Sequence, residues 1–165
     1  MFLVPVLERP HITGDCRRRI ISICCSTDLV EWDKPIICRF PEITEQMEAY
    51  SLQPFSYGDE RYGFLTVLNH DRGKSGGTLE LNGTQDIWLV RSDDLFVWNR
   101  VTTVAKCGIR GMYYDPTPLV VADQIYCATA SSNGHHGDFS RQSFIDIINL
   151  QGVFDAGNCR NTDNG

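Results

Sequence analysis

A seven-residue motif of the form Ser-x-Asp-Leu-x-x-Trp occurs twice in this chain of 165 residues and limits the folds that the chain can adopt. It spans residues 26–32 and 92–98, which places the copies 66 residues apart. A second set of identities recurs at an offset of 64 residues and pairs Tyr50 with Tyr114, Pro54 with Pro118, Tyr62 with Tyr126, and Asn69 with Asn133. Two sets with nearly the same period indicate a repeated structural unit of about 65 residues.

The best copy of this unit has the pattern of four β-strands. Its apolar and β-branched runs are short and are bounded by turn signals such as Asn82-Gly83, which favours strands over helices. The expected strands cover residues 50–57, 61–69, 86–91 and 96–101. A third, weaker copy at residues 145–154 resembles residues 87–96 without the serine or the tryptophan. Helical periodicity is confined to residues 42–49.

The repeated motif has a physical interpretation as a turn. Ser92 and Asp94 can accept hydrogen bonds from backbone N–H groups and hold a tight turn between the third and fourth strands. Leu95 and Trp98 then place apolar bulk between neighbouring sheets. Four-stranded units that repeat with one aromatic residue per unit are typical of a β-propeller. The sequence therefore predicts an all-β fold of antiparallel propeller blades, and a β-sandwich with an internal duplication is the alternative.

Charge and hydropathy exclude several classes of partner. The chain carries 15 Lys and Arg against 21 Asp and Glu, a net charge of −6, so its field repels phosphate and no nucleic-acid partner is expected. No apolar run approaches the length of a membrane span, so no membrane partner is expected. The apolar residues 1–7 lack the basic start of a signal peptide, which predicts a cytoplasmic chain, although a longer parent protein can still be secreted.

The seven cysteines have irregular spacing and form no Cys-x-x-Cys pair. This pattern fits neither a zinc ribbon nor a thioredoxin-like motif. We therefore expect seven free thiols that fill apolar positions in a reducing compartment.

The chain resembles a known group at the two copies of the motif and at Tyr114-Asp115-Pro116, which opens a strand. It is similar to the five-bladed β-propeller glycoside hydrolases of families 32 and 43, the invertase and arabinanase types, over about residues 20–156. The resemblance implies hydrolysis of glycosidic bonds. In that family the nucleophilic Asp lies on the first blade, a supporting Asp on the second and the acid Glu on the third. The first two have no counterpart here.

Five blades of this period need roughly 320 residues, so the chain corresponds to the later part of a propeller, about two to three of five blades. The expected divisions are residues 1–40 as the tail of one blade, 48–106 as a complete blade, 110–156 as a further blade and 157–165 as a tail. The chain is then either a fragment or a degenerate descendant. Self-association through exposed blade faces would complete a ring.

Strand direction predicts where a site would lie. The inner strands begin near Glu48 and Asp115, and each second strand returns to the same face of the ring. A glycosidase needs two carboxyl groups about 5 to 9.5 Å apart, so Asp115 and Glu48 are the candidate catalytic residues. The candidate substrate-binding residues are Tyr114, Arg110, His70, His135 and His136. Trp88 and Tyr113 are further candidates for stacking on a sugar ring, although a place wedged between blades is favoured for Trp88. Because adjacent histidines on a strand point apart and no third ligand is evident, neither a metal nor a cofactor is expected.

Each candidate also has a purely structural interpretation. Asp115 precedes Pro116 and can simply shape an extended strand entry, Glu48 can be the exposed end of a short helical connection, and Arg110 can be a solvated loop charge.

Two candidate functions follow from the resemblance. One is a glycoside hydrolase-like propeller that is inactive as this isolated chain, because one carboxylate partner lies on a missing blade. The other is a non-catalytic carbohydrate-binding or assembly module derived from the same propeller, and a saccharide is the expected ligand of the first.

Overall fold

A computed structural model describes residues 2–8, 20–44, 46–70, 83–106, 112–122, 124–134 and 142–158 of the chain. The described residues form strands almost throughout, as the all-β prediction required. The strands are β1 (Phe2–Glu8), β2 (Ile20–Ser26), β3 (Ile36–Ile37), β4 (Met47–Tyr57), β5 (Glu60–His70), β6 (Gly83–Ser92), β7 (Asn99–Ala105), β8 (Met112–Val121), β9 (Gln124–Ser132) and β10 (Ser143–Asn149), followed by helix α1 (Gln151–Asn158).

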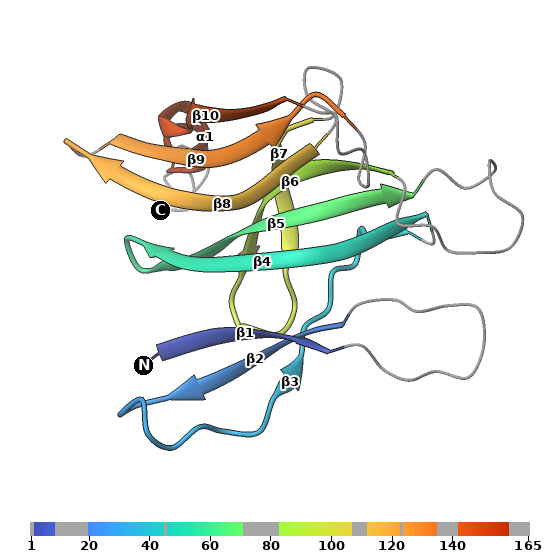
Figure 1. The fold of residues 1–165 in the computed structure, drawn as a ribbon. Coiled ribbons are helices and arrows are strands. Elements are labelled where there is room, and N and C mark those ends of the chain that lie inside the picture. The colour runs from blue at the N-terminus through green and yellow to red at the C-terminus, as the bar shows by residue number, and fades with distance from the viewer. Residues whose placement is uncertain are drawn as a thin grey trace, which may run out of the picture.

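The strands form three antiparallel sheets that stack on one another (Figure 1). The first sheet has the order β1-β2-β3, the second has the order β4-β5-β6-β7, and the third has the order β10-β9-β8. The second sheet lies between the other two, so both of its faces are covered by a neighbour (Figure 1). This arrangement of successive antiparallel sheets is that of neighbouring propeller blades.

Strand pairing repeats with the 66-residue offset seen in the sequence. The pairs Ser22–Ile37 and Ile23–Ile36 of the first sheet match the pairs Trp88–Thr103 and Leu89–Thr102 of the second. Trp32 and Trp98 therefore occupy equivalent places, each in the connection that follows the equivalent strand, as the repeat of the motif predicted.

The 64-residue offset is equally visible in the second and third sheets. The pairs Pro54–Gly63 and Pro118–Cys127 are equivalent, and both sheets have a register shift just before them, between Ala49 and Ser51 and between Tyr114 and Thr117. Because a register shift re-aims the side chains of the strand that carries it, the repeat preserves an irregularity as well as the regular ladder.

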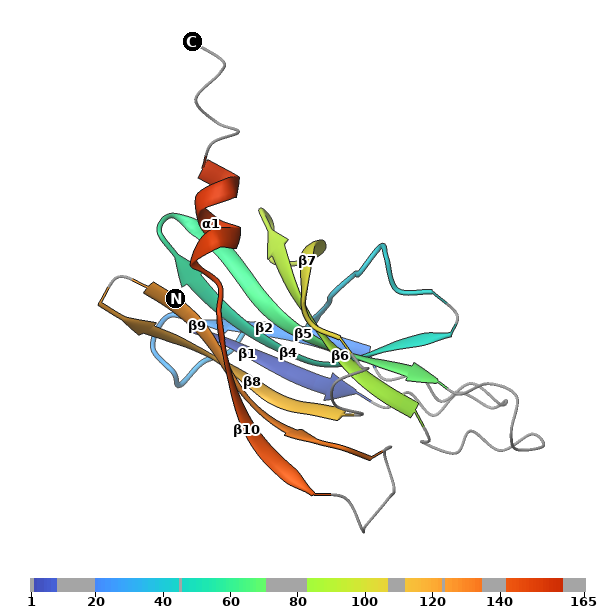
Figure 2. The same ribbon diagram turned by 90° about the horizontal axis from the view of Figure 1, so that it is seen from above.

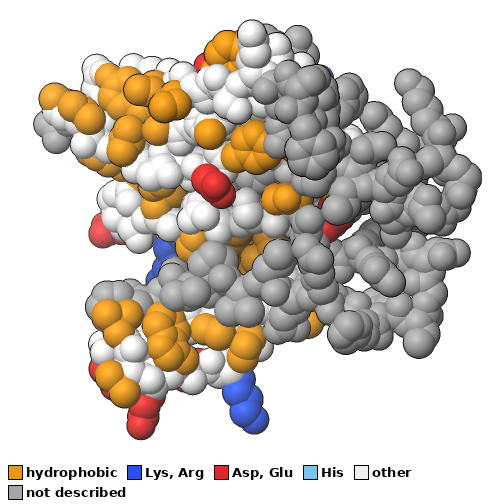
Figure 3. Space-filling model, in the orientation of Figure 1, with side chains coloured by type: hydrophobic (Ala, Val, Ile, Leu, Met, Phe, Trp, Pro, Cys, Tyr) orange, Lys and Arg blue, Asp and Glu red, His pale blue; other side chains and the backbone are white. Residues whose placement is uncertain are grey.

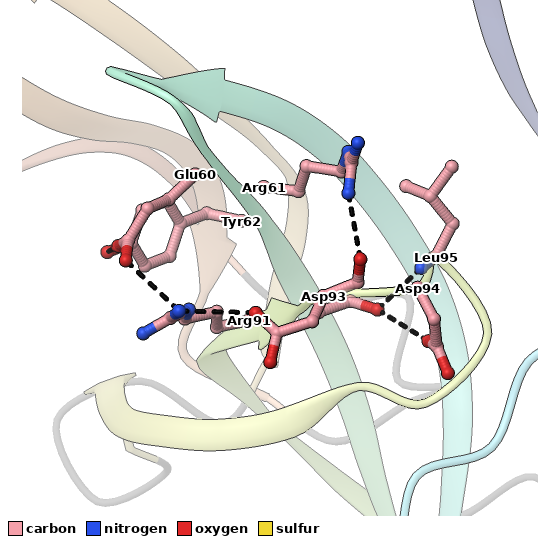
Figure 4. A network of polar contacts seen from close by, with 8 residues as sticks. Glu60, Arg61, Tyr62, Arg91, Asp93, Asp94 and Leu95 are labelled. Carbon is pink, nitrogen blue, oxygen red and sulfur yellow. Dashed lines mark hydrogen bonds and ion pairs between the residues drawn. The ribbon is translucent and has the colours of Figure 1, made fainter.

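The two copies of the motif form tight turns with the same hydrogen bonds. In the second turn, residues 92–98, Ser92 Oγ accepts the N–H of Leu95 at 2.8 Å, and Asp94 Oδ1 accepts the N–H groups of Phe96 and Val97, each at 2.8 Å. Figure 4 shows this turn beside the ion pair of Arg91 with Glu60. The fourth strand consequently starts at Asn99 and not at residue 96, because the preceding amides serve the turn.

The first turn, residues 26–32, is built in the same way. Ser26 Oγ accepts the N–H of Leu29 at 2.8 Å, and Asp28 Oδ1 accepts those of Val30 and Glu31 at 2.8 and 2.9 Å. The central leucine of each turn has a positive φ, 67° for Leu29 and 70° for Leu95. A left-handed conformation costs an L-residue roughly 1–2 kcal/mol, and the side-chain acceptors of each turn hold the backbone in it.

Two hydrophobic clusters fill the spaces between the sheets. The first cluster lies between the first and second sheets, and its fully buried members from the second sheet alternate along the strands: Leu52, Leu65, Val67, Trp88, Val90 and Trp98. The second cluster lies between the second and third sheets and includes Phe64, Ile87, Leu89, Ile125 and Cys127. Since successive residues of a strand face opposite sides, β5 and β6 supply both clusters at once.

The chain after β10 departs from the predicted third copy. Leu150 stands where the motif would have its serine, and helix α1 follows in place of a fourth strand. Asn149 Oδ1 accepts the N–H of Gln151 at 2.8 Å and caps the helix start. Phe154 of α1 packs against Tyr57 and Tyr62, with ring centroids 4.7 and 4.9 Å apart. The helix therefore lies beside the β4–β5 hairpin (Figure 2).

The helix suggested by the periodicity of residues 42–49 is wrong, because the described residues 42–44 and 46 are turn and irregular structure and β4 begins at Met47. No helix within the described ranges has the length and hydropathy needed to cross a membrane.

Candidate functional site

Glu48 lies near the start of β4 and is 4% exposed, opposite Leu68 of β5. It is therefore not the exposed end of a helical connection. The residue borders a pocket of about 190 Å³ at the junction of the first and second sheets, but its side chain points to the other face of β4 from Ala49, the face that carries Leu68 and Gln85. The other residues that line this pocket are apolar: Ile20, Ile21, Ile37, Cys38, Phe40, Ile43, Met47 and Ala49. Glu48 is thus buried in one row with Leu68 and Gln85 of the second sheet.

Asp115 lies on β8 inside the register shift that separates Tyr114 from Thr117, and its side chain is exposed. Its φ of 44° is left-handed, so the expectation that Pro116 imposes an extended conformation on Asp115 is wrong. Asp is one of the few residues that adopts this conformation singly. Two neighbouring hydroxyls hold the backbone here: Thr129 Oγ1 donates to the Tyr114 carbonyl at 2.7 Å, and Thr117 Oγ1 donates to the Asp115 carbonyl at 3.2 Å.

The aromatic candidates fall into two groups. Tyr114 is half-buried, and its hydroxyl lies 3.3 Å from Ser132 Oγ. Trp88 and Tyr113 are 2% and 4% exposed and belong to the two hydrophobic clusters. Trp88 is therefore wedged between sheets, as favoured from the sequence, whereas the buried Tyr113 does not present its ring for stacking on a sugar. The guanidinium of Arg100 also covers the Trp88 ring, 4.5 Å from its centroid.

The histidine and arginine candidates lie largely beyond what the structure describes. Arg110, His135 and His136 lie outside the described residues, and so does the side chain of His70. The backbone of His70 ends β5, two residues beyond the Leu68 that pairs with Glu48. Hairpin geometry thus brings the end of β5 back to the start of β4, as the topology argument required.

The two candidate carboxyl groups belong to different sheets and different surroundings. Glu48 is buried on the second sheet, whereas Asp115 is exposed on the third. They are not equivalent in the repeat either, since the 64-residue offset relates Glu48 to Met112 and Asp115 to Ser51. Their pairing as catalytic groups remains a prediction. Among the described residues, no cluster of three His, Cys, Asp or Glu side chains has the geometry of a metal site.

A group of buried polar side chains at the same end of the second sheet was not anticipated. Thr66 Oγ1 and both amide atoms of Gln85 are buried without a hydrogen-bond partner in the described part of the chain, and Gln85 lies opposite the same Leu68 that pairs with Glu48. On the third sheet, Ser131 Oγ donates to the carboxylate of Asp146. The alternation of Gln85 with Ile87 and Leu89 on one face was the available signal for this burial.

The described cysteines are free thiols: Cys24, Cys25, Cys38 and Cys127. This agrees with the expectation for these four. Burial raises the pKa of Cys38 to about 11 and that of Cys127 to about 12. Because the thiolate is the reactive form, these two residues fill the core and are not nucleophiles at neutral pH.

Comparison with known proteins defines the fold. No protein-family model and no curated protein sequence matches the chain. Among the solved structures that match are two of the GH32 beta-fructofuranosidase BmSUC1 of Bombyx mori, the second being a mutant in complex with sucrose. Each is 13% identical over 88% of this chain, with TM-scores of 0.59 and 0.58. The chain spans 31% of the length of that enzyme. It therefore has a glycoside hydrolase-like β-propeller fold, as the motif resemblance predicted.

Proposed function

We propose that this chain is part of a five-bladed carbohydrate-active propeller that hydrolyses glycosidic bonds in its complete form, and that the isolated chain is inactive. The observation that supports this proposal is the likeness of 88% of the chain to a beta-fructofuranosidase of which it spans only 31%. The sucrose bound by a mutant of that enzyme makes a saccharide the ligand to test.

The inactivity of the isolated chain follows from the surroundings of its two candidate carboxyl groups. A glycosidase needs an acid and a second carboxylate about 5 to 9.5 Å apart on either side of one bond. Glu48 is buried on the second sheet, and Asp115 is exposed on the third. In this proposal Asp115 orients a sugar together with Tyr114, Arg110, His135 and His136, Glu48 does so with His70, and the missing partner carboxylate lies on another blade.

A non-catalytic carbohydrate-binding or assembly module is the second candidate. The third sheet favours it, because Ile145 and Ile147 of β10 are 82% and 65% exposed. Neighbouring exposed apolar side chains of this kind mark an association surface. In this candidate the chain completes a ring by self-association, and Ile147→Lys lowers the mass measured by light scattering to that of the monomer.

The test is an assay of sucrose, aryl furanosides and aryl pyranosides, combined with sucrose binding observed by saturation-transfer NMR. We expect no turnover. We also expect sucrose to bind at least about fivefold more weakly to Asp115→Asn, because this variant loses one hydrogen bond to a charged group. Asp59→Asn, an exposed turn residue of the second sheet, is the matched control and leaves binding unchanged.

Turnover that disappears in both Asp115→Asn and Glu48→Gln would contradict the inactivity of the isolated chain. Sucrose binding that Asp115→Asn leaves intact would remove Asp115 from the site.

We also propose a reducing compartment such as the cytoplasm. The free state of the four described cysteines supports it. Titration of the denatured chain without reductant should then give seven thiols, and a count of five or fewer would contradict it.

A further inference from the structure

The second turn is covered by an extended segment from the preceding part of the chain. The covering segment, residues 38–40, leaves β3 and runs alongside the turn in a parallel bridge between Arg39 and Val97. Arg39 N donates to Phe96 O at 2.7 Å, and Trp98 N donates to Arg39 O at 2.9 Å. The thiol of Cys38 approaches the Leu95 carbonyl at 3.9 Å. These contacts use the backbone of the turn, and the segment seals Leu95 and Trp98 from solvent.

The first turn has the same backbone and no such cover. Leu29 is 55% exposed and Trp32 is 39% exposed, against 7% and 0% for their equivalents Leu95 and Trp98. Within the described part of the chain, no hydrogen bond reaches the N–H of Trp32 or the carbonyl of Val30, the two groups that correspond to those bound by Arg39. A depression of about 290 Å³ lies along residues 25–28 and 31–33.

The shape and chemistry of this surface match a strand-like segment. Figure 3 shows hydrophobic side chains exposed over the first sheet, with acidic groups beside them. Asp28, Glu31 and Asp33 are exposed and lie within two residues of the open backbone groups in the sequence, and Glu31 stands where the second turn has Val97. Leu29 is left-handed and exposed, so burial of its side chain does not offset its backbone strain. The equivalent Leu95 is left-handed and buried, so its burial offsets the strain.

We propose that the first turn, residues 26–32, is a docking site for an extended segment that leads into another propeller blade and is supplied by polypeptide outside these 165 residues. One residue of that segment donates its N–H to Val30 O and accepts the N–H of Trp32, as Arg39 does in the second turn. A small side chain precedes this residue, to approach the Leu29 carbonyl, and the residue itself is basic, to pair with Glu31. This is strand addition at a turn, with backbone bonds that give affinity and side chains that give selectivity.

This docking site does not depend on the proposed saccharide function. A second copy of the chain is a poor occupant, because its own residues 38–40 already cover its own second turn.

The test uses the intact chain and a synthetic peptide with the sequence of residues 34–43, carrying Cys38→Ala to prevent oxidation. Trp88 and Trp98 are buried, so the solvent-sensitive tryptophan fluorescence comes from Trp32. We expect the peptide to shift the emission to shorter wavelength in a saturable manner, and Trp32→Phe to remove the shift. The same peptide methylated on the nitrogen of Arg39 should bind at least about tenfold more weakly, because it lacks the donor to Val30 O.

A pair of variants at exposed acidic residues tests whether the peptide binds at the first turn. Glu31→Arg should weaken binding about fivefold or more by opposing the peptide's arginine, whereas Asp59→Arg, with the same change of charge on the second sheet, should leave it unchanged. Affinities are measured by anisotropy of a labelled peptide, so that they do not depend on Trp32. The proposal is overturned by absence of saturable binding, by equal affinity of the methylated peptide, or by binding that Glu31→Arg does not alter. A dimer that Trp32→Ala converts to monomer would also overturn it, because the occupant would then be a second copy.

Discussion

The first and second turns share a motif, a set of hydrogen bonds and a left-handed leucine, yet they differ in what lies over them. The second turn is sealed by residues 38–40, and its Trp98 is fully buried. The first turn leaves Trp32 partly in solvent. Local sequence is therefore sufficient for the conformation of such a turn, while its contribution to the hydrophobic core depends on a segment that arrives from the preceding blade.

The largest expected difference between the turns concerns their tryptophans. Trp98→Ala removes a fully buried aromatic side chain from the first cluster and should lower the free energy of unfolding by about 3–5 kcal/mol. Trp32→Ala should lower it by less than about 1 kcal/mol. Urea denaturation of both variants measures the difference, and similar losses would show that the two turns are equally covered.

The leucines should differ in the sign of the effect. Leu95→Gly loses a buried side chain but relieves a left-handed backbone, so we expect a net loss of about 2 kcal/mol. Leu29→Gly relieves the same strain at an exposed position and should range from neutral to about 1 kcal/mol stabilising, after the extra entropy of the unfolded glycine. Thermal and urea unfolding check both values. A loss of more than about 1 kcal/mol in Leu29→Gly would indicate that Leu29 is covered in the isolated chain.

The packing of Trp98 against β5 can be tested at Gly63. A methyl group at Gly63 would lie 2.7 Å from Leu52 Cδ1 and 3.2 Å from Trp98 Cζ3. Because both neighbours are fully buried, Gly63→Ala should destabilise the chain by about 1–2 kcal/mol. Gly152→Ala meets nothing within 4 Å and lies in helix α1, so this control should stabilise slightly. If both alanines were tolerated alike, the contact between Trp98 and β5 would be looser than described.

Acid titration is the property in which the turns should agree. Backbone hydrogen bonds, from Val97 first for Asp94 and from Glu31 first for Asp28, hold the pKa of each carboxyl below its ordinary value of 3.8. Each turn is therefore fully stabilised above that value and loses stability as the pH falls through the lowered pKa. Asp28→Asn and Asp94→Asn should each reduce the fall of melting temperature between about pH 5 and pH 2 by a similar, small amount. A much larger effect at Asp94 would mean that the covering segment, residues 38–40, also contacts the Asp94 carboxylate.

The sequence predicted the parts of the fold that depend on local pattern. Identities such as Pro54 with Pro118 predicted that the second and third sheets repeat one unit, and the same strand pairing does recur with the same offset. The Ser and Asp of the motif predicted the turn, because their side chains bond to amides only a few residues away. These features need no information about neighbouring sheets.

Features that depend on neighbours were not predictable in this way. The burial of Trp98 and the exposure of Trp32 differ although their motifs are the same. The left-handed Asp115 runs against the preference of a residue before proline, and hydroxyls from Thr117 and Thr129 hold it. Of the candidate site, topology predicted the return of β5 to Glu48, whereas the burial of Glu48 depends on side chains of neighbouring strands.

The position of the second sheet between two clusters has a consequence for the order of unfolding. Because β5 and β6 supply side chains to both clusters, unfolding of the second sheet disrupts both of them, whereas unfolding of the third sheet leaves the first cluster intact. Stacked repeats of this kind behave as a row of units coupled to their neighbours. Amide protons of β5 and β6 should therefore exchange with solvent only on global unfolding, and those of β3 and β10 through partial openings at either end of the row.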